Sequence, residues 1–254
     1  MTTKNNLQPQ LKRGETERIW SALSELRYIF RHALLRDAVY EMQLKSRLRN
    51  LHKLAGDTMI RLYPEDQEKL AEIAAHYEKA QEWENAMDYL TLAGDYYEKS
   101  LKYPEALTCY QKSMHICEKL KDPDHPDVAV ILDKLAEILR KVGRNKEANP
   151  LYQRALAICT STLGKSHPDT AQSMNHLAEC LEAIGDYEQA ESLYQEALRI
   201  SESVSGKDHP LSASYMDSLA GLLKAIGDYD QAEALYRRAI EISEKSIGKD
   251  HPDL

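Results

Sequence analysis

Gly164, Lys165 and Ser166 have the spacing of the last three residues of a phosphate-binding loop, which would imply nucleotide chemistry. Such a loop needs another glycine five positions before its second glycine, and it must join a buried strand to a helix, because consecutive backbone N–H groups surround the phosphates. Position 159 is instead Cys159, and the preceding residues, LYQRALAICT, have helical periodicity. The three residues therefore indicate something other than a nucleotide site.

The same stretch returns along the chain. GKSHPDT at 164–170 is followed by GKDHPLS at 206–212 and by GKDHPDL at 248–254, and LKDPDHPDV at 120–128 precedes them. Consecutive histidines of these stretches are 42 residues apart: His125, His167, His209 and His251. A fixed period of this length is typical of a repeat array. We therefore interpret GKS as one copy of a linker.

The remaining reactive side chains form no catalytic pattern. The other histidines, His32, His52, His76, His115 and His176, are scattered, without HExxH or another paired-ligand spacing. The four cysteines include no CxxC pair, and the carboxylates recur with the period, as solvating charges on helix faces do. We expect a protein that is not an enzyme and that binds no cofactor and no metal ion.

Each period reads as two amphipathic helices. Apolar residues recur at helical spacing before Gly143 (Leu132, Leu135, Ala136, Leu139) and again after it (Ala148, Leu151, Tyr152, Ala155, Ile158). Glycines in the same phase (Gly143, Gly185, Gly227) predict left-handed residues at the end of each first helix. The residues before each His-Pro (Asp124, Ser166, Asp208, Asp250) are expected as N-caps, with proline in the first turn.

A tyrosine recurs between two alanines on each second helix, as Tyr152, Tyr194 and Tyr236. A tyrosine stripe can stack on nucleic-acid bases. Recurrence inside an apolar face favours the other interpretation, in which the ring fills the gap between closely packed helices.

Composition and charge limit the remaining classes. The chain has 254 residues, 29% of them charged, which fits one or two globular domains. No segment has the length and hydrophobicity of a signal peptide or a membrane span, so we expect a soluble cytoplasmic protein without membrane contact. Residues 1–62 hold twelve Lys and Arg against six Asp and Glu, a charge of +6; because the whole chain carries −8, the remainder carries −14.

The alanine and tyrosine pattern and the 42-residue period resemble the tetratricopeptide repeat, in the longer variety found in kinesin light chains and in many bacterial proteins. The resemblance covers 124–254 and continues more loosely through 70–100 and 103–120. It implies an all-α fold, a right-handed superhelical solenoid of antiparallel helix pairs.

A second resemblance concerns the sequence RYIFRHALLRDAVYEMQLKSRLRNLHKLAGDTMIRLYPED at 27–66. It is similar to the junction in bacterial signalling ATPases of the STAND type, where such a stretch closes a winged-helix domain and leads through a basic helix into repeats. It implies a small helical remnant of a winged-helix junction before the solenoid. No Walker motif accompanies it, so ATP use is not carried over.

Together these observations predict four segments. They are a polar N-terminal segment, flexible or partly ordered, at 1–26; a basic helical junction at 27–66; degenerate helix pairs at 67–122; and three 42-residue repeats at 123–254, the last ending where a further repeat would begin.

The tetratricopeptide resemblance also implies a function, namely a non-catalytic scaffold that binds a peptide or helix in a concave groove lined by the first helix of each pair. Related groove binders hold the ligand backbone with an asparagine. Asn175 keeps it, whereas Asp133 and Asp217 replace it, which favours a basic or donor-rich partner. The groove positions that the resemblance implies are Asp133, Glu137, Arg140, Lys141, Gln172, Asn175, Glu179, Glu182, Ser214, Asp217 and Lys224.

Two other functions stay open at this point. The chain could be the sensor or oligomerisation arm of a STAND-type ATPase or transcription regulator, with the ATPase domain in the same or a neighbouring chain. The basic start could instead contact nucleic acid, which we consider the weaker alternative, since an ordinary surface helix has the same pattern.

Overall fold

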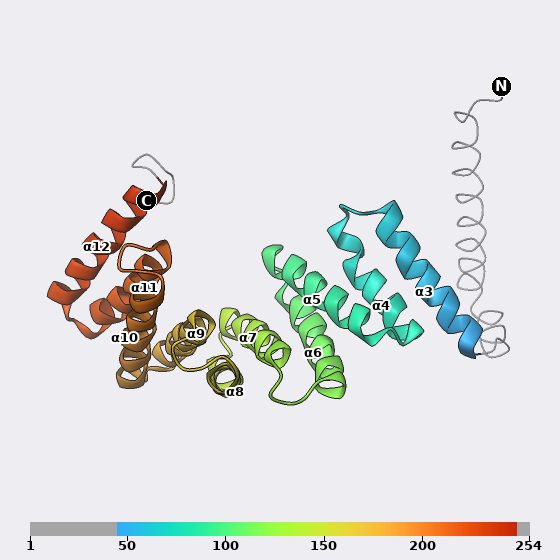
Figure 1. Ribbon diagram of the computed structural model, residues 1–254, viewed down its shortest axis with the longest axis horizontal. Helices are drawn as coiled ribbons and strands as arrows, with labels where there is room; N and C mark the ends of the chain where they lie inside the picture. The colour runs from blue at the N-terminus through green and yellow to red at the C-terminus, as the bar shows by residue number, and fades with distance from the viewer. Residues whose placement is uncertain (1–44, 248–254) are drawn as a thin grey trace, which may run out of the picture. The chain divides into compact units, whose positions relative to one another are not determined.

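The computed structural model describes residues 45–247, and each regular element in this range is a helix (Figure 1). In chain order these are α3 (Lys45–Leu62), the 3-10 helix η2 (Gln67–Lys69), α4 (Leu70–Ala80), α5 (Trp83–Lys99), α6 (Tyr103–Leu120), α7 (Pro126–Lys141), α8 (Asn145–Thr162), α9 (Pro168–Ile184), α10 (Tyr187–Val204), α11 (Pro210–Ile226) and α12 (Tyr229–Ile247). The predicted all-α class is confirmed. The predicted segment 1–26, residues 27–44 of the predicted junction at 27–66, and residues 248–254, which include His251, lie outside the described residues.

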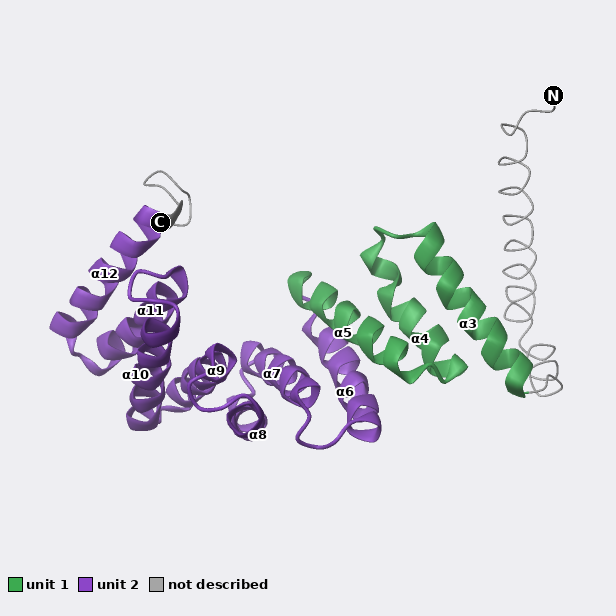
Figure 2. Cartoon of the chain, in the orientation of Figure 1, with its two compact units in different colours: residues 1–100 green, residues 101–254 purple. Residues whose placement is uncertain are grey.

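The chain divides into two compact units between Ser100 and Leu101 (Figure 2). In the second unit, α7 packs on α8, α9 on α10, and α11 on α12. Successive pairs are joined because α8 also packs on α9, and α10 on α11. This succession of adjacent helix pairs is the arrangement predicted for a solenoid. We call α7, α9 and α11 the first helices and α8, α10 and α12 the second helices.

The core of the second unit follows the alternation of small and large residues. Tyr152 and Tyr194 are each 1% exposed, and the alanines on both sides of each ring are fully buried. A small residue lets neighbouring helices approach, and the ring fills the space that remains. The interpretation of these two tyrosines as core residues is confirmed. On α12, Tyr236 packs against the same cluster but is only partly buried.

Glycine ends the first helices as predicted. Gly185 and Gly227 have φ angles of 94° and 93°, and Gly143 has 78°. A side chain in this left-handed region is strained by about 1–2 kcal/mol. The backbone N–H of Gly185 donates to the carbonyls of Leu181 and Glu182, which would otherwise lack partners at the helix end.

Three of the predicted N-caps, Asp124, Ser166 and Asp208, are wrong by one residue, and the fourth, Asp250, lies outside the described residues. His167, not Ser166, is the cap of α9: its backbone is extended and its Nδ1 accepts a hydrogen bond of 3.2 Å from the backbone N–H of Asp169. His125 and His209 cap α7 and α11 in the same way. The imidazole reaches the N–H two residues ahead because proline follows at the first helical position and fixes the turn.

The GKS stretch lies in the connection between α8 and α9. Thr162 ends α8 and Pro168 begins α9, and Gly164 has a φ of 93°. The Thr170 hydroxyl donates to the Gly164 carbonyl at 2.8 Å, which ties the connection to the start of α9. A helix, not a strand, precedes the glycine. The interpretation of GKS as a linker is confirmed.

The first unit contains a buried histidine pair. His52 of α3 is 1% exposed, and its Nδ1 lies 3.0 Å from the Nδ1 of His76 on α4. Burial lowers the pKa of His52 to about 4, and the charges of His76 and Lys79 add to this effect. Burial also lowers the pKa of His76. Both rings are therefore neutral at neutral pH, and one can donate to the other.

Candidate functional site

A pocket of about 470 Å³ opens between α7 and α9. Of the predicted groove residues, it contains Asp133 and Gln172. Its lining comes from one face of α7, the end of α8 and the first turns of α9, namely Pro126, Ala129, Val130, Asp133, Lys134, Cys159, Leu163, Asp169, Gln172 and Ser173. Its volume lies in the range of small-molecule and side-chain binding sites. We call it the α7–α9 pocket.

Charged residues next to this pocket pair across α7 and α9. His176 Nδ1 lies 2.8 Å from Oδ2 of Asp133. Arg140 donates two hydrogen bonds of 2.9 Å to Glu137, and its Nη2 lies 3.2 Å from Glu179 Oε2. Asp133, Glu137 and Arg140 share one face of α7 because three- and four-residue steps return to the same side of a helix. We call these five residues the groove network.

The network changes the proton affinities of its members. Burial opposes a charge on His176, but the hydrogen bond and charge of Asp133 outweigh it and raise the pKa of His176. Burial likewise disfavours a charge on Glu137, yet the two bonds from Arg140 lower the pKa of this carboxyl. For Glu179, burial is the stronger influence and raises the pKa. Arg140 thus stabilises the charge of Glu137 more than that of Glu179.

The hydroxyl groups of two core tyrosines contact carboxylates on the first helices. Tyr152 donates to Glu137 Oε2 at 2.9 Å, and Tyr194 donates to Glu182 Oε2 at 3.0 Å. Each ring is buried between second and first helices, while its hydroxyl orients a carboxylate that is only partly buried. A buried tyrosine normally needs such a partner. These tyrosines therefore connect the core to predicted partner-binding residues of α7 and α9.

Two further predicted residues contact the network. Lys141 Nζ lies 3.4 Å from Glu137 Oε1. Asn175 is 6% exposed, and its Nδ2 donates to Glu179 Oε1 at 2.8 Å. Among the described residues, Asn175 Oδ1 has no hydrogen-bond partner. An unpaired buried acceptor costs about 1–3 kcal/mol, so this oxygen would gain from a donor brought by a ligand.

The predicted residues on α11 lie apart from the groove network. Ser214, Asp217 and Lys224 are exposed. Within residues 45–247, no hydrogen bond or ion pair joins them to the network. The structure thus brings the predicted residues of α7 and α9 together and leaves those of α11 as separate surface groups.

Sequence reasoning missed His176 and the hydroxyl roles of Tyr152 and Tyr194. Spacing alone leaves His176 among the scattered histidines, although it follows Asn175 on a predicted groove helix. The equivalent residues in the neighbouring repeats are Lys134 and Ser218, so the repeat pattern does not predict a basic residue at this position.

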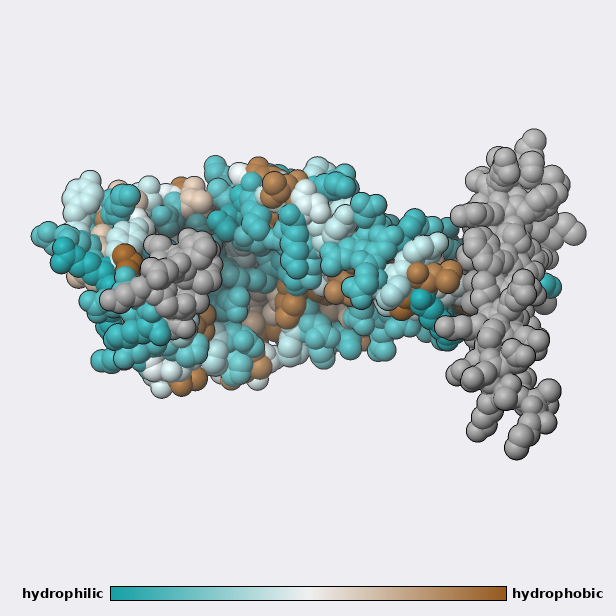
Figure 3. Space-filling view, turned by 90° about the horizontal axis from the view of Figure 1, so that it is seen from above, coloured by the Kyte–Doolittle hydropathy of each residue, from teal (hydrophilic) through white to brown (hydrophobic). Residues whose placement is uncertain are grey.

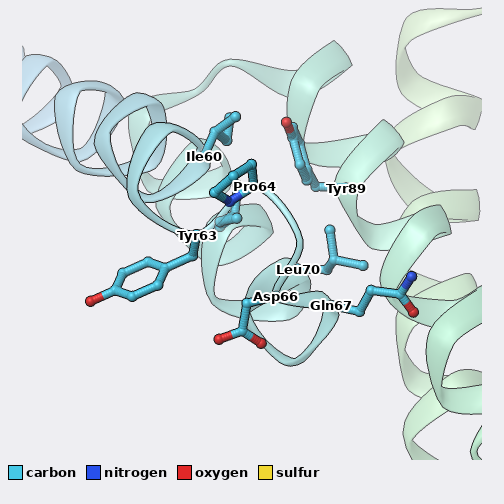
Figure 4. Close-up of a pocket in the computed structure, with 8 residues that line it drawn as sticks. Ile60, Tyr63, Pro64, Asp66, Gln67, Leu70 and Tyr89 are labelled. Atoms are coloured by element: carbon cyan, nitrogen blue, oxygen red, sulfur yellow. The ribbon is translucent and has the colours of Figure 1, made fainter.

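A second, smaller pocket lies in the first unit. It has a volume of about 70 Å³ and is lined by residues of α3, η2, α4 and α5. Figure 4 shows Tyr63 pointing away from the space that Ile60, Leu70 and Tyr89 surround. This volume is comparable to that of a few water molecules, so the α7–α9 pocket is the better candidate site.

The described residues contain no group of three or more His, Cys, Asp or Glu that could hold a metal ion. No helix in the described part is long and apolar enough to cross a membrane.

On the face in Figure 3, hydrophilic residues predominate and hydrophobic ones occupy small separate areas.

Comparisons with solved structures give the same fold. BtubC from P. vanneervenii matches with a TM-score of 0.64 and 21% identity, over 95% of this chain and 94% of that chain. A putative kinesin light chain from Podosopora anserina, with nearly identical TPR-like repeats, has a TM-score of 0.61 and 23% identity, over 81% and 99% of the two chains. MamA from Desulfovibrio magneticus RS-1 has a TM-score of 0.55 and 15% identity, over 79% and 97%.

A search of curated proteins gives no match. A model of the tetratricopeptide repeat matches three overlapping windows, residues 85–161, 128–203 and 169–245. These windows run from α5 to α12 and together span more than half of the chain. The chain therefore belongs to the tetratricopeptide repeat family, whose repeats typically serve as scaffolds for protein–protein interaction.

Proposed function

We propose that the chain is a non-catalytic scaffold that binds a peptide or a helix along the groove formed by its first helices. The observation that supports this function most is the α7–α9 pocket of about 470 Å³ with the groove network beside it. A peptide needs both apolar space for side chains and polar groups for its backbone, and the pocket and the network supply the two side by side.

The chemistry of the partner follows from the acceptors along this groove. Asn175 Oδ1 is buried without a partner in the described part of the chain, and the Asp217 carboxylate is exposed. Asp133 is engaged by His176, but a carboxylate has further acceptor sites. Residues 63–254 carry −14. A peptide rich in donors or positive charge is therefore the partner we propose.

The test uses peptides selected from a random display library on the wild-type chain. A groove variant, Gln172→Arg with Asp217→Arg, changes two exposed positions on first helices. A matched control, Gln195→Arg with Asp230→Arg, changes the same residue types at exposed positions on second helices. We expect the groove variant to weaken binding at least tenfold and the control to leave it unchanged, as measured by fluorescence anisotropy.

Salt gives a second readout. The affinity of the wild type should fall between 0.1 M and 1 M salt, because the Debye length shrinks from roughly 10 Å to 3 Å. Equal affinities of wild type, groove variant and control would place the binding surface elsewhere. In every case circular dichroism should keep its helical signal, since exposed substitutions cost within about 0.5 kcal/mol.

A second candidate function is the sensor or oligomerisation arm of a STAND-type regulator. The observation in its favour is the basic helix α3, on which Arg47 and Arg49 are exposed. The same helix is where nucleic acid would bind. Arg47→Glu with Arg49→Glu should change the mass measured by light scattering if α3 mediates assembly, and should abolish binding of a labelled DNA duplex if α3 contacts nucleic acid. No change in either would eliminate both ideas.

A further inference from the structure

The α7–α9 pocket lies where one residue departs from the repeat pattern. Residues 42 apart occupy equivalent places on the first helices, and one such set is Ile131, Ser173 and Tyr215. Ile131 and Tyr215 are each 3% exposed, so both large side chains are buried. Ser173 occupies the same place with a much smaller side chain, and it lines the pocket. The pocket is therefore the space that a large residue occupies in the other repeats.

The surroundings of Tyr215 show what this space can hold. Tyr215 packs in one cluster with Ala171, Ala197 and Ile200. One period earlier, the equivalent residues are again two alanines and an isoleucine, Ala129, Ala155 and Ile158. Ala155 and Ile158 are buried, and Ala129 lines the pocket. The residue types that pack against Tyr215 thus recur at the equivalent positions one repeat earlier, and one of these residues, Ala129, lines the pocket with Ser173.

Two positions at the rim of the pocket are apolar in this repeat and polar in the next one. Val130 and Leu163 line the pocket and are 53% and 38% exposed. Their equivalents one period later are Gln172 and Ser205, which are polar. Exposed apolar residues beside an unfilled apolar space gain free energy when a ligand covers them. The unfilled space at Ser173 and the apolar rim residues Val130 and Leu163 therefore occur in the same repeat.

Charge at the rim is mixed. Asp133 and Asp169 line the pocket, as does Lys134, whose Nζ lies 5.8 Å from the centre of the Tyr110 ring. The Asp169 side chain is 67% exposed and lies 3.7 Å from His167. If a side chain of a bound peptide entered the pocket, a basic residue next to it in the peptide would lie near the carboxylates of Asp133 and Asp169.

We propose that the α7–α9 pocket receives one aromatic side chain of the bound partner, in the place that Tyr215 occupies in the next repeat. This rests on the proposed groove function and names the anchor residue that the groove selects. Ser173 makes the space, Val130 and Leu163 cover the outer part of the ring, and Asp133 and Asp169 favour a basic residue next to it.

The test fills the α7–α9 pocket with a side chain of the protein itself. Ser173→Tyr places in the pocket the ring that Tyr215 supplies one repeat later, while Ser173→Ala removes the hydroxyl and keeps the space. We expect peptides selected on the wild type to share one aromatic position. Changing it to alanine should weaken binding about 10- to 100-fold, the effect of burying one large apolar side chain. Ser173→Tyr should weaken the parent peptide equally, and Ser173→Ala should not.

A second variant covers the case in which Ser173→Tyr fails to fold. Val130→Lys introduces a positive charge at an exposed rim position, and should reduce binding of the aromatic peptide more than binding of its alanine version. Thermal unfolding of each variant shows whether the fold is retained.

The outcomes separate this proposal from the groove function. Peptide binding that is weakened by Asp217→Arg, yet unaffected by both Ser173→Tyr and Val130→Lys, would overturn the aromatic anchor and leave the groove function intact. The same holds if the selected peptides share no aromatic position. If no selected peptide depends on Asp217 or on the pocket variants, both proposals fail.

Discussion

His176 and His52 lie in opposite electrostatic environments. Both rings are largely buried, and burial disfavours a positive charge on each. The difference is the partner, because His176 contacts the Asp133 carboxylate whereas His52 contacts another imidazole. An opposite charge within hydrogen-bond distance outweighs burial, and a neutral ring does not. The same residue type therefore has a raised pKa in the groove and a lowered one in the first unit.

We predict that the two histidines titrate on opposite sides of the ordinary value of 6.5. The ring signals of His52 should change near pH 4, and those of His176 above 6.5, in an NMR titration of the whole chain. Asp133→Asn removes the negative charge and should move the His176 midpoint downward. A His176 midpoint below 6.5 in the wild type would contradict the ion pair.

The consequences for stability have opposite signs. The raised pKa of His176 gives stability that is fully present below pH 6.5 and is lost as pH rises through the folded value. The lowered pKa of His52 gives stability that is present above pH 6.5 and is lost as pH falls toward 4. Acid should therefore weaken the packing of α3 on α4, while His176 stays protonated.

At the scale of the helix, the His-Pro sequence both caps and starts each first helix. Its imidazole accepts a hydrogen bond from the backbone N–H two residues ahead. At the first position of a helix a backbone N–H has no intrahelical partner, so proline, which lacks this group, loses no hydrogen bond there. The aspartate or serine before each described histidine lies outside the helix. The linker therefore has a structural role that explains why it recurs before α7, α9 and α11.

We predict that His167→Ala lowers the free energy of unfolding by about 1 kcal/mol, the usual cost of losing an N-cap. His167→Asn should lose much less, because its side-chain oxygen can accept the same hydrogen bond. Urea unfolding followed by circular dichroism measures both. An equal loss in the two variants would mean that His167 acts through packing rather than as a cap.

At the scale of the molecule, the second unit is an array in which the main contacts join neighbouring helices. The α9 helix packs chiefly on α8 and α10, with fewer contacts to α7 and α11. Stability in such an array is approximately a sum over repeats and their interfaces. A defect in one repeat should therefore weaken its neighbours before it affects helices further along.

We predict such a local effect for Gly185→Val. Gly185 has a φ of 94°, and a β-branched residue there is strained by about 1–2 kcal/mol, although no atom within 4 Å would clash with a Cβ. Hydrogen exchange should speed up most in α9 and α10 and least in α6 and α12. Gly185→Asn is the control, because asparagine tolerates this region better. Uniform loss of protection over the unit would contradict a repeat array.

The sequence by itself determined the helix pairs, their glycine ends and the burial of Tyr152 and Tyr194, because helical periodicity and left-handed turns depend on residues close together in the chain. The sequence-based prediction placed each described N-cap one residue too early. Residue spacing does not show that a histidine side chain can accept the hydrogen bond from the backbone N–H two residues ahead. The groove positions on α7 and α9 came from the repeat resemblance. Which of them contact one another did not follow from it.

Only the tertiary structure decided the pairing of Asp133 with His176 and the vacancy at Ser173. The first requires two side chains from different helices to meet, at 2.8 Å, across an interface. The second depends on side-chain volume: Ser173 lines a pocket together with Ala129, whereas Tyr215 at the equivalent position one repeat later is packed in a buried cluster. Side-chain volume and position in three dimensions, which periodicity does not encode, set both features.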